Sequence, residues 1–536
     1  MLNNDLGHIH LFGNPAENFY ALGKRDKNAF AEVYEQISRL CIRNDFMSKV
    51  LKATSELSTR FNKKKHGPHF DDIKSYAEGL ERPVEDVIFT MLMPEMVASF
   101  NKWAPDLLSL LPGCSSLFIW DKKNHGSIHT RILDYALSGP FEKFERSILY
   151  DFKDRYKIFS YGSAGIALPG LTAMNDQGLT LALHYKHGQY FNLEGESIFF
   201  IASEILSECA SGREAIKLLR SKQSISFWGL YLTDKNGEVT SIDICGKELH
   251  QEKFDLKDHP YLYFNNRALL KKPEHENMQP YGNLEQCLMR TQSLKKRMDN
   301  IQLDSSKDLM EESLNILGAP HAKKVHTAAK WVLPTITPSS IQLCSFHNSL
   351  NAAYFVSGAA PKFFTGNYLK QTNLFNQLDT KQITKKIKSD KYLKGHKYLS
   401  DFQTQLDKNN VTAAYHALQM SILYLEDFEE VSVLKFYFHI LEYIYESDKR
   451  DLSYLYQDFQ NLEGKLPPYL NDHRLLFMLR TSKLLNQKVV NNVQQISNQG
   501  LKELYRKEFN LNAMAIKGLK FLIYPRIEIL DIIYAY

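Results

Sequence analysis

The stretch PGCSSLFIWDKKNHGSIHTRILDY, residues 112–135, is the most informative part of the chain. It places Cys114 between a glycine and two serines at the head of an apolar run, reverses at residues 124–126, and returns through a second run that carries Arg131 and Asp134. Apolar runs joined by a turn that contains Asn and Gly are typical of an antiparallel hairpin. This hairpin would bring a thiol, a guanidinium group and a carboxylate to one end of the paired strands.

The charged groups of this hairpin suit a reactive cysteine. A neighbouring cation lowers the pKa of a thiol and raises the thiolate fraction, and we expect Arg131 to act on Cys114 in this way, with Asp134 favouring the charged Arg131. Strict alternation along a strand would put Arg131 and Asp134 on opposite faces, so this arrangement requires a bulge or a strand end between them. The alternative is a buried structural thiol beside an ordinary ion pair.

The predicted secondary structure of the rest of the chain changes twice along the sequence. Residues 1–113 have helical periodicity, except that FNKKKHGPHF, residues 61–70, contains Gly and Pro and predicts a loop. Residues 114–375 contain short β-rich runs joined by turns, with two helical stretches inserted, and residues 376–536 are helical again. We therefore expect an α+β domain between a helical N-terminal segment and an all-α C-terminal extension.

Composition narrows the function. The 536 residues include 66 basic and 61 acidic side chains, and a net charge of +5 is too small and too dispersed for a nucleic-acid binder. The N-terminus does not resemble a secretory signal and no apolar stretch is long enough to span a membrane, so we expect a cytoplasmic protein. The lysine-rich residues 381–397 and the apolar residues 521–536 form no sustained amphipathic helix with a basic face, so we expect no membrane contact.

Metal ligation is not expected. The six cysteines lie far apart without a C-x-x-C pair, and the five other than Cys114 are interpreted as core residues. His125 and His129 are four positions apart but on a hairpin, and His66 and His69 lie in the expected loop, so neither pair is expected on a helix, where such a spacing would bring two ligands to one face.

At Cys114-Ser115-Ser116 and at Arg131-x-x-Asp134-Tyr135 the sequence resembles the choloylglycine hydrolase, acid ceramidase and penicillin acyltransferase group of N-terminal nucleophile hydrolases. The resemblance implies a four-layer αββα fold. It also implies autocatalytic cleavage between Gly113 and Cys114, which frees an α-amino group that serves as general base for the thiol. Arg131 follows Cys114 by 17 positions, one more than is usual in the group, and the extra residue can lie in the turn.

Further landmarks extend the resemblance over roughly residues 15–370. Residues 169–185 are similar to the group's Gly-Leu hairpin, in which Asn175 is structural. YLYFNNRALL, residues 261–270, is similar to a strand that ends in an asparagine whose amide donates to the oxyanion, and either Asn265 or Asn266 could fill that role. Arg290 resembles an arginine near the group's active site.

One departure concerns the substrate side of the site. Relatives often have Asn after the second strand of the Gly-Leu hairpin, whereas this chain has His184 and Tyr185. A backbone N–H at this position can still donate to an oxyanion, because any non-proline residue supplies one. We therefore assign His184 and Tyr185, together with Arg290, to substrate binding.

The sequence thus predicts an enzyme that forms a thioester on Cys114. It would be a cysteine amidohydrolase or acyltransferase acting on linear, non-peptide C–N amides, with an N-acyl amide or an acyl-coenzyme A as the acyl source and without a cofactor. Its domains would be the N-terminal segment 1–113, the catalytic domain 114–375 and the C-terminal domain 376–536. The alternative is an inactive scaffold whose C-terminal helices bind a protein partner, and a chain that stays uncleaved would favour it.

Overall fold

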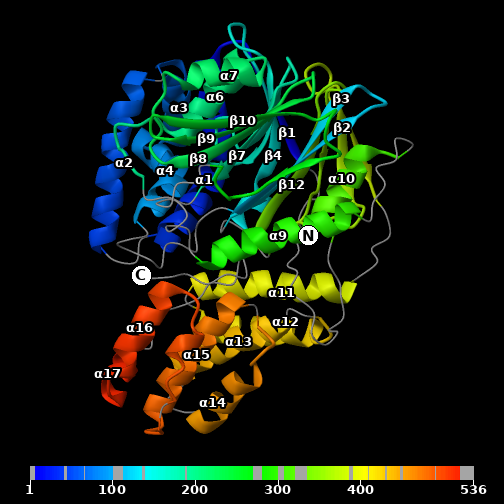
Figure 1. Cartoon of the computed structure of the whole chain (residues 1–536). Coiled ribbons are helices and arrows are strands. Elements are labelled where there is room, and N and C mark those ends of the chain that lie inside the picture. The colour runs from blue at the N-terminus through cyan, green and yellow to red at the C-terminus, as the bar shows by residue number, and fades with distance from the viewer. Residues whose placement is uncertain are drawn as a thin grey trace.

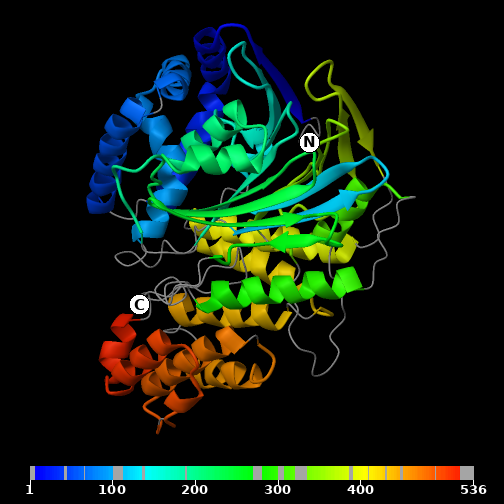
Figure 2. The same cartoon turned by 45° about the horizontal axis from the view of Figure 1, so that its top comes forward.

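Two β-sheets stacked face to face form the centre of the computed structural model, and helices cover the outer face of each sheet (Figures 1 and 2). The order of layers is helix, sheet, sheet, helix, which confirms the expected αββα fold with a helical region at the C-terminal side. The structure describes residues 6–41, 45–65, 67–100, 113–135, 139–186, 190–269, 281–299, 307–319, 335–337, 339–384, 390–408, 410–428, 431–446, 451–466, 468–488 and 490–519.

The first sheet has eight strands. In spatial order they are β1 (Gly7–Phe12), β4 (Glu145–Asp151), β5 (Ile158–Ser163), β6 (Thr172–Asn175), β7 (Thr180–Tyr185), β8 (Phe227–Thr233), β9 (Glu238–Cys245) and β10 (Glu248–Asp255). β1 runs parallel to β4, and the other neighbours are antiparallel. β1 was not predicted within the helical N-terminal segment, although buried Ile9 and Leu11 alternate with exposed His8 and His10.

The second sheet has seven antiparallel strands. In spatial order they are β11 (Leu262–Phe264), β2 (Gly113–Asp121), β3 (Gly126–Asp134), β12 (Ser340–His347), β13 (Ala352–Phe355), β14 (Tyr368–Thr372) and β15 (Asp379–Ile383). β15 continues this sheet beyond residue 375, and the division of the chain into three domains stays a prediction.

The hairpin of β2 and β3 forms as expected. Its pairing runs without a shift from Gly113 opposite Asp134 to Asp121 opposite Gly126. The carboxylate of Asp121 accepts hydrogen bonds from the backbone nitrogens of Lys123 and Asn124, at 2.9 and 3.2 Å, which closes the turn.

The helices over the first sheet come mostly from the N-terminal segment. They are α1 (Pro15–Cys41), α2 (Asp45–Lys65), α3 (Gly67–Leu80), α4 (Val84–Phe100), α6 (Ile198–Glu208) and α7 (Gly212–Leu219), with the short α5 (Pro140–Lys143) before β4. The predicted loop at residues 61–70 was wrong, since α2 extends to Lys65 and α3 begins at Gly67. Pro68 is the second residue of α3, where a backbone N–H has no partner within the helix, so the proline does not break it.

The helices over the second sheet are α9 (Tyr281–Asp299) and α10 (Leu309–Gly318), and the C-terminal helices pack beyond them (Figure 1). The latter are α11 (Asp390–Asp407), α12 (Val411–Tyr424), α13 (Val431–Leu441), η2 (Glu442–Glu446), α14 (Leu452–Asn461), α15 (Pro468–Leu484), η3 (Val493–Gln495), α16 (Gln499–Phe509) and α17 (Ala513–Leu519). Among the described residues, no helix is both long and apolar enough to cross a membrane. The apolar residues 521–536 lie outside the described residues.

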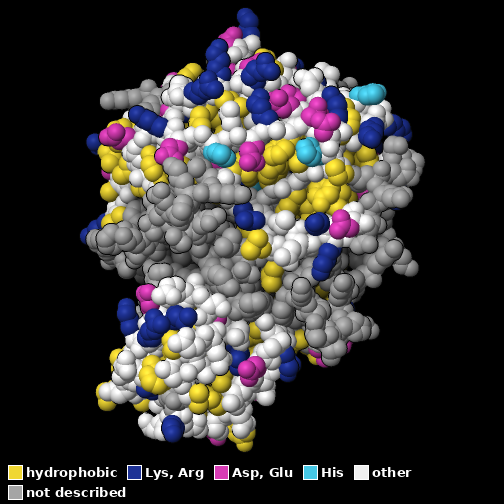
Figure 3. All heavy atoms as spheres, viewed as in Figure 1, with side chains coloured by type: hydrophobic (Ala, Val, Ile, Leu, Met, Phe, Trp, Pro, Cys, Tyr) yellow, Lys and Arg dark blue, Asp and Glu magenta, His cyan; other side chains and the backbone are white. Residues whose placement is uncertain are grey.

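Charges of both signs share the surface. On the face shown in Figure 3, the described basic and acidic side chains are interspersed, in keeping with a net charge of +5. The two inner faces of the sheets instead pack as an apolar layer that includes Phe159, Tyr161, Phe346 and Phe355. This layer holds the sheets together and fixes the strands that carry the candidate site.

Candidate active site

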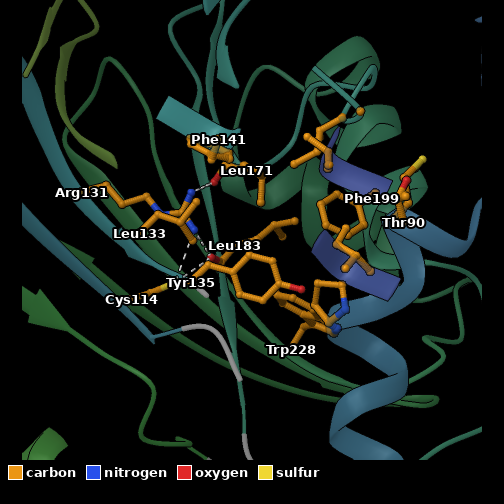
Figure 4. A pocket seen from close by; sticks show the side chains of 16 residues that line it. Thr90, Cys114, Arg131, Leu133, Tyr135, Phe141, Leu171, Leu183, Phe199 and Trp228 are labelled. Atoms are coloured by element: carbon orange, nitrogen blue, oxygen red, sulfur yellow. Dashed lines mark hydrogen bonds between the residues drawn. The ribbon is translucent and has the colours of Figure 1, made fainter. Parts of the chain in front are cut away.

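Cys114 is the second residue of β2 and is 1% exposed. Its sulfur lies 3.4 Å from Nη2 of Arg131, on the neighbouring strand β3, and 3.5 Å from the carbonyl oxygen of Leu183. The Arg131 guanidinium group also donates to the carbonyl oxygens of Leu171 and Leu183, so it is held by the first sheet (Figure 4). The expected contact between the Cys114 thiol and the Arg131 guanidinium group is therefore present.

The protonation state of the thiol follows from two opposing effects. Burial raises the pKa of Cys114, and the positive charge and hydrogen bond of Arg131 oppose this shift. Burial is the stronger effect in this structure, in which Gly113 is joined to Cys114. The neutral thiol is therefore favoured here, and water near Cys114 would lower its pKa.

Asp134 has a different partner from the one expected. The pairing of β2 with β3 contains no bulge, and Asp134 is the last residue of β3, on the opposite face of the strand from Arg131. Its Oδ2 lies 3.4 Å from Nη1 of Arg290, and its Oδ1 accepts from the hydroxyl of Ser340 at 2.5 Å. Burial raises the pKa of the Asp134 carboxyl, and Arg290 is the largest opposing influence.

Gly113 packs directly against Asp134. A Cβ atom on Gly113 would lie 2.6 Å from Oδ2 of Asp134, which is closer than a real Cβ contact allows. The absence of a side chain at residue 113 therefore lets the Asp134 carboxylate lie beside the residue that precedes Cys114.

The two candidate asparagines point in different directions. Oδ1 of Asn266 accepts from the backbone nitrogen of Cys114 at 2.8 Å, and its Nδ2 donates to the carbonyl oxygen of Tyr185 at 2.9 Å. The amide of Asn265 instead donates to α9, at the carbonyl oxygen of Cys287 and the hydroxyl of Thr291. The structure therefore brings Asn266 to Cys114 and directs Asn265 away from it.

Arg290 of α9 connects these groups from the outer face of β2. Its Nη1 lies 3.2 Å from the carbonyl oxygen of Cys114, and its Nη2 lies 3.2 Å from Oδ1 of Asn266. With its contact to Asp134, this 1% exposed side chain contacts three of the residues singled out from the sequence. Arg290 lies beside the backbone of Cys114 rather than beside its thiol.

His184 lies in a separate network between the sheets. Its Nε2 is 2.8 Å from the hydroxyl of Ser116, which is 3.1 Å from Nε2 of His129. Burial, strengthened by Arg131, lowers the pKa of His184 well below its ordinary value and that of His129 to about 3, so both rings are neutral. Among the described contacts of His184, none is to Cys114. Tyr185 reaches the site through its backbone carbonyl.

An apolar cavity of about 40 Å³ opens beside Cys114 (Figure 4). Its lining comes from both sides of Cys114 in the sequence: Val33, Ile37, Thr90, Met91, Pro94, Leu133, Tyr135, Phe141, Leu171, Leu183, Phe199 and Trp228 are among the residues that surround it. The contribution of α1 and α4 to this cavity was not predicted from the sequence. The carbonyl groups that hold Arg131 were not predicted either, because every residue supplies a carbonyl group and no sequence signal marks these two.

His129 and His66 each belong to one of the histidine pairs considered in the sequence. His129 contacts Ser116 and Thr180, and His66 lies outside the described residues. Within the described part of the chain, no group of three or more His, Cys, Asp or Glu residues could hold a metal ion. Four other described cysteines, Cys209, Cys245, Cys287 and Cys344, are buried and take part in no disulfide.

Solved structures of hydrolases are similar to this chain. Penicillin V acylase from Agrobacterium tumefaciens is 12% identical, over 50% of this chain and 90% of its own, with a TM-score of 0.33. A mutant of conjugated bile acid hydrolase from Clostridium perfringens is 12% identical, over 51% of this chain and 98% of its own, with a TM-score of 0.31. No curated protein sequence matches the chain.

Residues 139–349 match the sequence model of the acyl-coenzyme A:6-aminopenicillanic acid acyl-transferase family. The matched range includes His184, Tyr185, Asn266 and Arg290 and begins after the hairpin that carries Cys114. The resemblance expected from the sequence is thereby confirmed over this range, and the match supports an enzyme of the acyltransferase or amidohydrolase type.

Proposed function

We propose that this chain is a cysteine N-terminal nucleophile amidohydrolase or acyltransferase with Cys114 as its nucleophile. The contact between Oδ1 of Asn266 and the backbone nitrogen of Cys114, at 2.8 Å, carries this proposal. A nitrogen held in this way becomes the α-amine of Cys114 once the preceding peptide bond is cleaved. This amine and the thiol belong to the same residue, so the amine is close enough to take the thiol proton. Arg131, 3.4 Å from the sulfur, favours the thiolate.

The first reaction is cleavage of the chain between Gly113 and Cys114. The Cys114 sulfur attacks the carbonyl carbon of Gly113, the C–N bond breaks, and the proton of the thiol is transferred to the nitrogen that leaves. Water then hydrolyses the thioester, which gives a carboxylate on Gly113 and restores the thiol. One water is consumed, and the products are fragments 1–113 and 114–536.

The second reaction repeats this chemistry on a substrate. The α-amine takes the thiol proton, the thiolate attacks the acyl carbonyl, and the resulting oxyanion is stabilised by the Asn266 amide and a backbone N–H near Tyr185. The protonated amine then gives its proton to the leaving nitrogen. Water or an acceptor amine finally attacks the thioester on Cys114, and the first gives hydrolysis whereas the second gives acyl transfer.

The lining of the cavity favours an apolar acyl group. Side chains such as Val33, Met91, Phe199 and Trp228 offer no charge to a ligand, so the acyl chain of an N-acyl amide or of an acyl-coenzyme A suits them. The volume of about 40 Å³ holds at most a few water molecules, so the site must open before it admits such a chain. Loss of the bond between Gly113 and Cys114 would release the head of β2.

An inactive scaffold is the second candidate, and the burial of Cys114 favours it. A thiol that is 1% exposed, with a pKa raised by burial, is poorly placed to attack an external substrate while the chain is intact. In this case the C-terminal helices, α11 to α17, would supply the binding surface for a protein partner.

Trapping of the acyl group separates the two candidates. Purified protein is incubated with N-acyl amides of increasing chain length, quenched in acid and analysed by mass spectrometry. The enzyme predicts an acyl adduct on the fragment that begins at Cys114, and Cys114→Ala, the matched control, forms none. A wild-type protein that neither acquires an adduct nor releases an amine from any of the series supports the scaffold.

A further inference from the structure

Lys186 is an uncommon residue for its position. It directly follows β7, and its side chain is 0% exposed. Its ammonium group donates to the hydroxyl of Tyr231 at 2.6 Å, and its nearest carboxylate, that of Asp243, is 3.8 Å away. Burial lowers the pKa of Lys186, and Asp243 opposes this shift. A buried cation is costly unless its surroundings compensate for lost water, so this one requires a structural or functional reason.

The other two contacts of the ammonium group indicate that reason. Nζ donates to the carbonyl oxygen of Asn265 at 3.0 Å and to that of Arg267 at 2.6 Å. These carbonyl groups belong to the residues on either side of Asn266. The ammonium group therefore holds the backbone before and after the asparagine that contacts Cys114.

Two further contacts bind the same segment to the first sheet. The Asp243 carboxylate accepts from the backbone nitrogen of Leu269 at 2.6 Å, and the carbonyl oxygen of Tyr185 accepts from Nδ2 of Asn266. Residues 265–269 belong to no helix or strand, so a regular backbone ladder does not fix them. Contacts from Tyr185, Lys186 and Asp243 take its place.

The neighbouring strand makes room for this lysine. A Cβ atom on Gly229 of β8 would lie 2.4 Å from Cε of Lys186, so a side chain at residue 229 would displace the lysine stem. Gly229 has no positive φ, and its lack of a side chain therefore serves packing rather than backbone conformation.

We propose that Lys186 is a positioning residue for Asn266, which it orients toward the nitrogen of Cys114 through the two flanking carbonyl groups. This inference rests on the proposed function, because the orientation of Asn266 matters only if Asn266 takes part in the reaction. Lys186 itself does not contact the reacting atoms. Its loss should slow the chemical step and leave the binding of the acyl chain unchanged.

Two variants test the proposal in different ways. Lys186→Met keeps the length of the stem and removes the donors, whereas Gly229→Ala keeps the lysine and displaces it. Lys362→Met is the matched control, because Lys362 is also 0% exposed and pairs with a carboxylate, that of Glu145, at 2.5 Å. For each cleaved protein, kcat and KM are measured with an N-acyl amide that the wild type turns over, beside the thermal unfolding temperature.

We expect kcat to fall by about 10²-fold in Lys186→Met and in Gly229→Ala with KM unchanged, since displacement of a catalytic group by about 1 Å has an effect of this size. Lys362→Met should lose thermal stability and keep kcat. Wild-type kcat in either folded test variant, or a failure of both to fold, would overturn the inference and leave Lys186 as a structural residue. A wild-type protein that is cleaved but turns over no acyl donor would contradict the proposed function instead.

Discussion

Asn266 accepts a hydrogen bond from the backbone nitrogen of Cys114 at 2.8 Å, although 152 positions separate the two residues. This contact joins the head of β2 to the segment that follows β11. Because the nitrogen is the atom that cleavage would turn into a free amine, the contact connects the fold of the intact chain with the chemistry proposed for the cleaved one.

The side-by-side asparagines give the first prediction. Asn266→Ala should lower kcat by about 10²- to 10³-fold, the loss typical of an oxyanion donor, and it also removes the acceptor for the Cys114 nitrogen. Asn265→Ala is the matched comparison and should lower kcat less than Asn266→Ala does, because its amide contacts α9 and the backbone nitrogen of Arg267 rather than Cys114. Steady-state kinetics of both cleaved proteins provide the measurement, and equal losses would refute the assignment of Asn266.

Gly113 gives a prediction about cleavage. Gly113→Ala puts a methyl group 2.6 Å from Oδ2 of Asp134, and overpacking of a buried site costs about 1–3 kcal/mol. We expect the start of β2 to shift in this variant. Cleavage, followed by mass spectrometry as the fraction of cleaved chain over time, should then be at least several-fold slower than in the wild type. Gly162→Ala is the control, since a Cβ there meets no atom within 4 Å. Cleavage of Gly113→Ala at the wild-type rate would show that the contact is not required.

Arg131 gives a prediction about thiol reactivity. Arg131→Met removes the cation 3.4 Å from the sulfur of Cys114, so the pKa of the thiol should rise further. The rate of alkylation by iodoacetamide, measured against pH on cleaved protein, should then have its midpoint at higher pH than in wild type. The carbonyl groups of Leu171 and Leu183 also lose a donor, which should lower the free energy of unfolding.

The control for this variant is Arg480→Met in α15. Arg480 is 1% exposed and forms an ion pair with Glu508 of α16, so its loss also breaks a buried charge pair. It should lower the unfolding temperature and leave the alkylation midpoint of Cys114 in place. An unchanged midpoint in Arg131→Met would show that Arg131 does not lower the pKa of the Cys114 thiol.

Glu95 predicts a pH dependence of stability. It lies on α4, accepts from the backbone nitrogen of Ile198 at 3.2 Å, and burial raises its pKa from 4.5 to about 8. Between these values the folded protein keeps a proton that the unfolded chain has lost, so a rise in pH favours unfolding by roughly 1.4 kcal/mol per pH unit. Relative to wild type, Glu95→Gln should therefore gain free energy of unfolding as pH rises from about 4.5 to about 8.

Denaturant unfolding at several pH values checks this prediction. Glu78→Gln is the control, because Glu78 is exposed on α3 and its carboxylate lies 3.8 Å from the ammonium group of Lys74 in a surface ion pair. Its difference from wild type is the reference with which the slope of Glu95→Gln is compared. A flat difference for Glu95→Gln would mean that Glu95 is ionised in the folded protein.

Local features of the sequence predicted the hairpin of β2 and β3 and the structural role of Asn175. Apolar runs and a turn between Asp121 and Gly126 specify β2 and β3, and the register follows from the turn because the strands are adjacent in the sequence. Asn175 was correctly predicted to be structural, since its amide closes its own turn and caps α6. The contact of Asn175 within its turn spans four positions and is predictable from the turn, whereas its contact with α6 spans 31 positions and is not.

Contacts between distant segments could not be predicted in the same way. The alternation of β3 indicates that Arg131 and Asp134 face opposite sides, but the partner of Asp134 is Arg290, 156 positions later on a helix. Likewise β1 pairs with β4, so that His8 meets Ser147 across 139 positions. Pairing of this kind is fixed by the packing of whole layers, and a pattern within one segment does not contain it.

The intact mass and N-terminal sequence of the purified protein, compared with those of Cys114→Ala, test the central claim most directly. The account predicts two fragments for the wild type, one of which begins at Cys114, and a single uncleaved chain for the variant. A single uncleaved chain in both proteins would contradict it, because the nitrogen held by Asn266 would then remain a peptide nitrogen and could not act as the base.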